Sequence, residues 1–125
     1  MVKIHTHKDL EVYQLAYSLA MEIFNLTKTF PIEERYSLTD QIRRSSRSVP
    51  ANISEAWRKR IYPKSFVAKI NDAEAEATET QVWLDFSFNC NYIDEEVHGR
   101  LYSEYDRVLG KLVKMRNNPE KWTIG

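Results

Sequence analysis

Four stretches of the sequence carry apolar residues in steps of three and four, which is the period of an amphipathic α-helix. They cover residues 9–29, 36–60, 63–90 and 94–117. Long helices joined by short connections pack most simply as an up-down-up-down bundle, and a chain of 125 residues has room for one hydrophobic core. We therefore predict an all-α four-helix bundle over residues 9–118, with a flexible N-terminal arm at 1–8 and a C-terminal tail at 119–125.

The helix ends are predicted from breakers and capping residues. Pro31 follows the first stretch, and Pro63 suits the first turn of the third helix, where its missing N–H is not needed. Asp9 is expected to cap the first helix, and Ser37 with Asp40 has the spacing of a capping box for the second. The fourth helix is predicted to begin at Asp94.

Pro50 lies inside the second helical stretch. A proline there removes one backbone hydrogen bond and clashes with the carbonyl of Ser46, at a cost of about 3 kcal/mol unless a kink relieves it. The segment either bends or divides into two helices. The hydroxyls of Ser45, Ser46 and Ser48 could bond freed carbonyls, which favours a second helix kinked at Pro50.

Composition excludes several classes of protein. The chain has 18 basic and 18 acidic residues, so it is not a uniformly basic nucleic-acid binder. Its single cysteine, Cys90, cannot form an intrachain disulfide. No stretch approaches the ~18 apolar residues of a membrane span, and the N-terminus lacks the apolar run of a signal peptide. We expect a cytoplasmic protein that does not contact a membrane.

The balanced charge is divided unequally between the second and third helices. Residues 36–60 hold six basic and two acidic side chains, a net charge of +4, whereas residues 64–90 hold two and five, a net charge of −3. The basic residues of the second helix could contact the phosphates of RNA or DNA, or they could pair with carboxylates of the third helix. The two interpretations can hold for different residues. The candidates are Arg43, Arg44, Arg47, Arg58, Lys59 and Arg60.

The third helix has two apolar faces. The second face lies about 200° from the main stripe at 100° per residue, and it comprises Ala68, Ala75, Val82, Trp83, Phe86 and Cys90. A helix that is apolar on two sides is buried on two sides, which predicts self-association through Val82, Trp83 and Phe86. Asp72 and Glu79 share a face and are candidates for ion pairs at that interface. Alternatively, Trp83 and Phe86 cover the bundle end or a loop.

Signals for catalysis or metal binding are weak. Glu95 and His98 form a single E-x-x-H motif, whereas a di-iron bundle needs two such motifs and two further glutamates. His98 is therefore expected to be solvated. His5 and His7 have no third ligand nearby in the sequence. We expect no enzymatic activity, no catalytic residue, no metal and no cofactor.

A family resemblance centres on residues 41–56. The pattern S-V-P-x-N-I-x-E is matched by Ser48, Val49, Pro50, Asn52, Ile53 and Glu55. Together with residues 9–16 and 79–84, this segment resembles the four-helix-bundle proteins encoded in intervening sequences of bacterial 23S rRNA genes. The chain departs from the family at Ala56, where glycine is usual, and in the basic and aromatic turn at 57–62.

The resemblance implies a protomer of a ring-like homopentamer. Such a pentamer is similar to the accessory protein of diversity-generating retroelements, which binds nucleic acid and a reverse transcriptase. The expected function is a non-enzymatic homo-oligomeric scaffold that binds RNA or DNA through basic residues of the second helix. The alternative is a module that binds a protein partner and no nucleic acid, with its basic residues in subunit ion pairs and Trp57 and the tyrosines presented to that partner.

Overall fold

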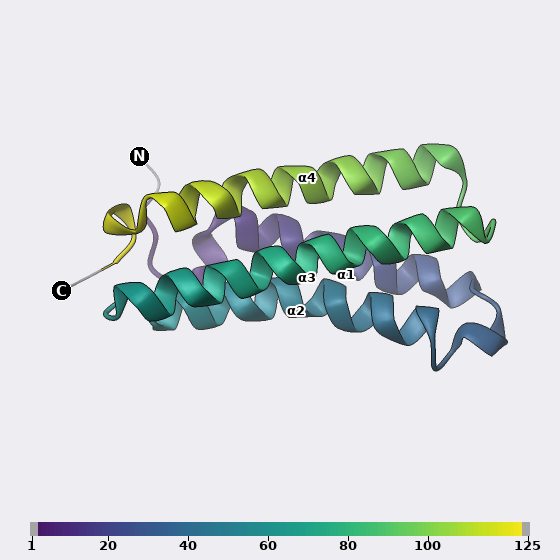
Figure 1. Ribbon diagram of the computed structural model, residues 1–125, viewed down its shortest axis with the longest axis horizontal. Helices are drawn as coiled ribbons and strands as arrows, with labels where there is room; N and C mark the ends of the chain where they lie inside the picture. Colours follow the sequence, from purple (N-terminus) through teal and green to yellow (C-terminus); the bar gives the residue numbers. More distant parts are fainter. Residues whose placement is uncertain (1–2, 124–125) are drawn as a thin grey trace.

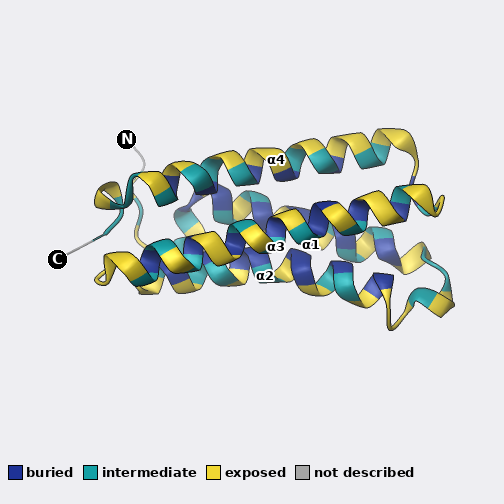
Figure 2. Cartoon of the chain, in the orientation of Figure 1, coloured by how far each residue is buried: buried dark blue, intermediate teal, exposed yellow. Residues whose placement is uncertain are grey.

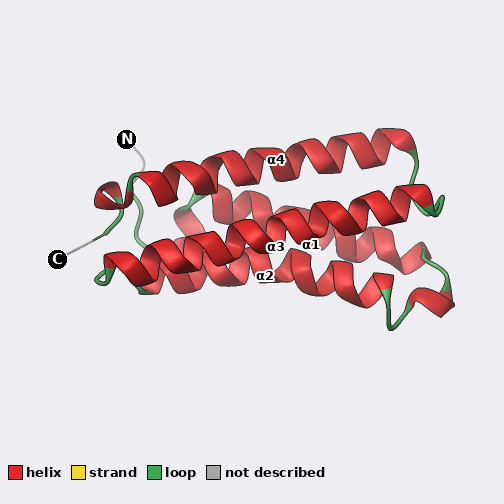
Figure 3. Ribbon diagram, viewed as in Figure 1, coloured by secondary structure: helices red, strands yellow, loops and turns green. Residues whose placement is uncertain are grey.

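The computed structural model describes residues 3–123 and contains four long helices. Successive helices run in opposite directions, as the up-down-up-down prediction requires (Figure 1), and Figure 3 shows no strand in the described part of the chain. The all-α prediction is confirmed. The helices are α1 (Glu11–Leu26), α2 (Leu38–Arg58), α3 (Pro63–Asn89) and α4 (Glu95–Asn117). Shorter 3-10 helices cover His7–Asp9, Thr27–Thr29, Ile32–Glu34 and Pro119–Lys121.

Two predicted helix starts are confirmed and two caps are wrong. Pro63 opens α3, and the Asp94 carboxylate caps α4 by accepting from the N–H of Val97 at 2.8 Å. Asp9 belongs instead to the 3-10 helix before α1, where its carboxylate accepts two backbone N–H groups. Ser37 caps no N–H of α2; its hydroxyl donates to Glu34 at 2.6 Å.

Helix α2 continues through Pro50, so the two-helix alternative is wrong. The hydroxyls of Ser45, Ser46 and Ser48 donate to backbone carbonyls three or four residues earlier. None of these bonds goes to the carbonyl of Ser46, which is the one that Pro50 leaves without its usual partner. The serines bond the carbonyls that a helical serine can reach. The expectation that they would bond the carbonyl freed by Pro50 is therefore wrong. The kink stays a prediction.

The core lies along the bundle axis, where all four helices turn their buried faces inward (Figure 2). Buried alanines, among them Ala16, Ala73 and Ala77, stand beside larger aliphatic side chains. Across the α2–α3 contact, the buried hydroxyls of Ser45 and Thr80 lie 2.8 Å apart. Polar groups therefore also take part in the closest helix packing.

The segments outside the predicted domain contribute to packing. Ile4 and Trp122 lie against the hydrophobic core from opposite ends of the chain. The predicted arm at 1–8 includes the start of the His7–Asp9 helix, and the predicted tail includes Pro119–Lys121. Residues 1–2 and 124–125 of these predictions lie outside the described range. No helix within residues 3–123 combines the length and apolar character needed to cross a membrane.

Glu34 ties the α1–α2 connection to the α3–α4 connection. Its carboxylate accepts from the hydroxyl of Ser37 at 2.6 Å and from that of Tyr92 at 2.9 Å. These two hydrogen bonds lower the pKa of Glu34. The hydrogen bond to Glu34 raises the pKa of Tyr92 to about 12.

Replacement of Glu34 by glutamine should lower the melting temperature near neutral pH. A carboxyl whose pKa is depressed in the folded state stabilises that state above its unfolded pKa of roughly 4.3, and the contribution is lost as pH falls. The difference between native chain and Glu34→Gln should therefore shrink toward about pH 3. Thermal unfolding followed by circular dichroism measures it. Glu33→Gln is the control, and an equal difference at both pH values would contradict the prediction.

Candidate nucleic-acid and self-association surfaces

The basic residues of α2 separate according to the helix beside them. Arg44 forms ion pairs with two carboxylates of α3, those of Glu76 at 3.2 Å and of Glu79. For this residue, the structure confirms pairing between the second and third helices. Arg44 is consequently a poor phosphate ligand, because its charge is already matched.

Arg43 packs against the end of α1. Its Nε donates to the Thr27 hydroxyl at 2.7 Å, and its guanidinium lies 4.8 Å from the centre of the Phe24 ring. Arg47, one turn further on, lies over the same ring at 5.5 Å and is exposed. Within residues 3–123, no carboxylate comes within ion-pair distance of either arginine.

The remaining three basic residues stand where α2 ends. Arg58 and Lys59 are exposed, and neither forms an ion pair in the described part of the chain. Arg60 is partly covered: it lies 3.5 Å from the centre of the Trp57 ring and donates to the Trp57 carbonyl at 2.7 Å. Burial and the neighbouring charge of Arg58 lower the pKa of Arg60. Among the six candidates, the exposed cations that form no ion pair in the described part of the chain are thus Arg47 and Arg58 of α2 and Lys59, which directly follows it.

The residues of the S-V-P-x-N-I-x-E pattern join α2 to α3. Val49, Pro50 and Ile53 are buried. On the polar side, Lys69 of α3 reaches the Glu55 carboxylate at 2.8 Å and the Asn52 side-chain oxygen at 3.4 Å. The amide of Asn52 also donates to the carbonyl of Ser48 at 2.9 Å. The pattern therefore acts in this protomer as a helix-packing element.

The second apolar face of α3 is exposed on the protomer. Val82 and Phe86 retain 44% and 53% of their surface. Trp83 is half-buried, with its ring 5.7 Å from that of Phe86 and its indole N–H donating to Glu79 at 3.0 Å. Tyr36, 83% exposed, extends this face past the start of α2. A hollow of about 400 Å³ lies between Tyr36 and the α3 residues, and its lining includes Tyr36, Trp83 and Phe86.

The two acidic residues expected at this face have partners within the chain. Asp72 lies 3.7 Å from Lys69, and Glu79 bonds Arg44 and Trp83. Glu79 therefore links α3 to α2 and orients Trp83, whereas Asp72 pairs within α3. The large exposed side chains of the face, Val82 and Phe86, are apolar.

The environment of His98 differs from the solvated one that was expected. It is partly buried, stacked on Phe88 at 4.9 Å between ring centres, and its Nε2 lies 2.8 Å from Asp85. The expectation of a solvated histidine is wrong, because Phe88 and Tyr102 cover it once α3 and α4 pack. Residues 3–123 contain no group of three histidine, cysteine or carboxylate side chains placed to hold a metal ion.

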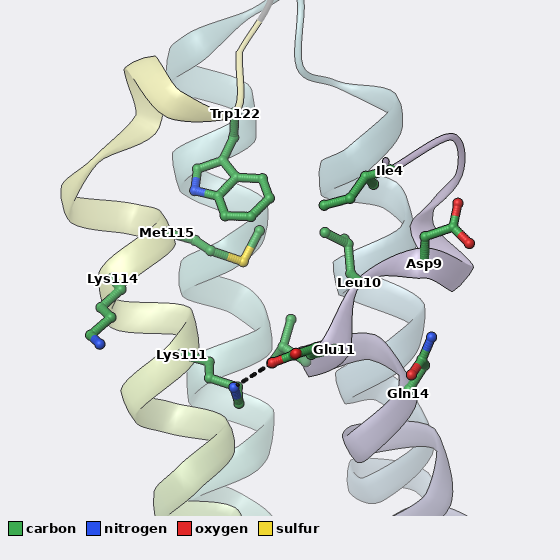
Figure 4. A pocket seen from close by; sticks show the side chains of 10 residues that line it. Ile4, Asp9, Leu10, Glu11, Gln14, Lys111, Lys114, Met115 and Trp122 are labelled. Atoms are coloured by element: carbon green, nitrogen blue, oxygen red, sulfur yellow. Dashed lines mark hydrogen bonds and ion pairs between the residues drawn. The ribbon is translucent and has the colours of Figure 1, made fainter. Parts of the chain in front are cut away.

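A cavity of about 500 Å³ opens between the start of α1 and the end of α4. Figure 4 shows Trp122 and Met115 pointing into it from one side and Ile4 and Leu10 from the other. At its edge, Lys111 pairs with Glu11 at 3.1 Å. Sequence reasoning missed this hollow because Ile4 and Trp122 were placed outside the folded domain; their apolar character was the available signal.

Comparisons with known proteins agree on one family. A model described as 23S rRNA-intervening sequence protein matches residues 8–114. A crystal structure from Bacteroides thetaiotaomicron VPI-5482, described as a protein of unknown function from the S23 ribosomal protein family, superposes with a TM-score of 0.77 and 29% sequence identity. The match covers 85% of this chain and 95% of that one. A search of curated proteins finds no match.

Proposed function

Because the chain belongs to the 23S rRNA-intervening sequence protein family, we propose that it is a non-enzymatic, homo-oligomeric scaffold that binds RNA or DNA through exposed basic residues of α2. The observation that carries the proposal is the division of the α2 cations. Arg43 and Arg44 bond other side chains of the protomer, whereas Arg47, Arg58 and Lys59 are exposed and form no ion pair among the described residues. The family description and the solved relative, which is described as being of unknown function, name no catalytic activity.

Self-association is supported by the apolar face of α3. Phe86 and Val82 are exposed beside Trp83, and an apolar patch on a protomer indicates an interaction surface. The family resemblance implies a homopentamer for this assembly. Light scattering at micromolar concentration tests the proposal: the mass should be two or more times 14.8 kDa, in whole multiples. A single-chain mass would contradict it.

Oligomerisation would strengthen binding to a polyanion. A chain with equal numbers of basic and acidic residues attracts nucleic acid weakly over long distances. Copies of Arg47 and Arg58 on one assembly would contact several phosphates of the same strand, and linked weak contacts add through effective concentration. The scaffold and the binding activity are therefore connected.

Reversing two exposed charges should weaken nucleic-acid binding. Arg47→Glu/Arg58→Glu is expected to lower affinity for RNA or DNA by about tenfold or more and to reduce its dependence on salt, because phosphate contacts are lost. Fluorescence anisotropy across a salt series measures both effects. The matched control is Arg107→Glu/Lys114→Glu, which changes the net charge equally at exposed positions of α4. Equal losses in both variants, or no loss, would contradict the proposed contacts.

The alternative function is a protein-interaction module whose basic residues serve in ion pairs. The pairing of Arg44 with Glu76 and Glu79 favours it for that residue. Exposed Tyr36 and Tyr62 offer contact area for a polypeptide. An intact oligomer that binds neither RNA nor DNA at low salt would favour this alternative.

A further inference from the structure

A groove runs between α1 and α2 next to the exposed arginines. It encloses about 350 Å³. Tyr17 and Met21, on its α1 side, are 53% and 46% exposed, although both are large apolar side chains. Its principal lining residues are Tyr13, Tyr17, Met21, Arg47, Pro50 and Ala51.

Aromatic rings follow one another along the α1 side of this groove. The rings of Tyr13 and Tyr17, one helical turn apart, have centres separated by 6.0 Å, and His7 meets Tyr13 edge-on at 4.8 Å. At the other end of α1, Phe24 lies under Arg43 and Arg47. The groove itself thus combines the rings of Tyr13 and Tyr17 on its α1 side with the guanidinium of Arg47 on its α2 side.

Ion pairing turns several acidic residues away from this groove. Glu11 and Glu22 of α1 pair with Lys111 and Arg100, which are both on α4. Glu55 of α2 pairs with Lys69 of α3 at 2.8 Å. The described lining of the groove therefore includes Arg47 and no carboxylate.

The basic character continues along α2. Arg58 follows Arg47 by eleven residues, or three helical turns, so the two side chains leave the helix on nearly the same side. Arg58 is exposed at the end of α2, beyond the part of the groove next to Pro50. A ligand that contacts both arginines would pass the Tyr17 ring on the way.

We propose that the α1–α2 groove binds single-stranded RNA or DNA, with bases stacked on Tyr17 and Tyr13 and phosphates contacting Arg47 and Arg58. The inference rests on the proposed function, and it specifies that the nucleic acid is single-stranded and that the α1–α2 groove is the surface that binds it. Stacking on a protein ring needs a free base face, which a single strand offers and a duplex hides. A protein partner would have to bury the Arg47 charge, which is costly without a matching carboxylate, whereas a phosphate supplies the opposite charge.

The test compares labelled single strands of about 15 nucleotides with duplexes of equal length, using fluorescence anisotropy. Tyr17→Ala should weaken single-strand binding by about five- to a hundred-and-fiftyfold, the range that loss of one stacked base produces. Tyr17→Phe should retain affinity, because it keeps the ring. The salt dependence should stay the same in both variants, because no phosphate contact is removed. Tyr62→Ala, at an exposed tyrosine outside the groove, is the control.

Each contrary result has a distinct meaning. If single strands and duplexes bind equally and Tyr17→Ala changes nothing, while Arg47→Glu/Arg58→Glu weakens both, the proposed function holds and the stacking groove is overturned. If the native chain binds no nucleic acid, both proposals fail. If Tyr17→Ala lowers the mass measured by light scattering, the groove is a contact between copies of the chain, which also overturns the inference.

Discussion

Replacement of Phe86 by glutamate is expected to convert the proposed oligomer into a single chain of 14.8 kDa. Phe86 and Val82 are exposed on the α3 face predicted to bind another copy. Burying an unpaired carboxylate in an apolar contact costs several kcal/mol, which is enough to shift an assembly equilibrium by more than about a hundredfold. Light scattering should show the lower mass at a concentration where the native chain is assembled.

The protomer itself should stay folded in this variant. Phe86 lies outside the buried core, so the helical circular dichroism of Phe86→Glu should match that of the native chain. Ser103→Glu is the matched control, because it adds the same charge at an exposed position of α4. An unchanged mass for Phe86→Glu would show that this face does not hold the subunits together.

Substitutions at Tyr105 should change stability in opposite directions. The side chain is fully buried on α4, and its hydroxyl has no hydrogen-bond partner among the described residues. Tyr105→Phe removes the unpaired hydroxyl and should raise the free energy of unfolding by about 1 kcal/mol or more. Tyr105→Ala leaves a cavity and should lower it by about 3–5 kcal/mol. Denaturant unfolding at one fixed protein concentration measures both.

Alkaline pH provides a second test of the Tyr105 environment. Burial raises the pKa of Tyr105 above its ordinary value. The Tyr105 phenol then ionises more readily in the unfolded chain, which favours unfolding above about pH 10. The free energy of unfolding therefore falls as pH rises. Tyr105→Phe should lose less stability than the native chain between about pH 9 and 11. Equal losses of unfolding free energy in the two chains would contradict the raised pKa of Tyr105. A Tyr105→Phe variant less stable than the native chain at neutral pH would contradict an unpaired hydroxyl.

The helices were predictable because their signals are local. Apolar residues spaced three and four apart indicate a helix within one segment of the chain. Pro63 in a first turn and Asp94 before a helix likewise mark helix starts through the backbone next to them. The failed caps show the limit of that reasoning. Ser37 had the right spacing, but its hydroxyl donates to Glu34 and accepts no N–H of α2. Asp9 belongs to the capping box of a short 3-10 helix that begins after Thr6 and has little periodic signal.

The candidate surfaces were predicted unevenly. The second apolar face of α3 follows from helical angles alone, and the structure leaves Val82 and Phe86 of that face exposed. The division of the arginines does not follow from spacing. Arg43 and Arg44 are adjacent in the sequence, yet one bonds Thr27 and the other pairs with Glu76, because consecutive positions on a helix point about 100° apart.

The four amphipathic helices and their order follow from the amino-acid sequence, since burial of a periodic apolar stripe is a property of each segment. Which charges stay exposed depends on how the helices pack against one another. Glu11 and Glu22 turn toward α4 because Lys111 and Arg100 lie there, and Glu55 turns toward Lys69. An ion pair depends on the distance between two side chains far apart in the chain, and helix packing sets that distance. The cationic, aromatic groove between α1 and α2 is a consequence of that packing.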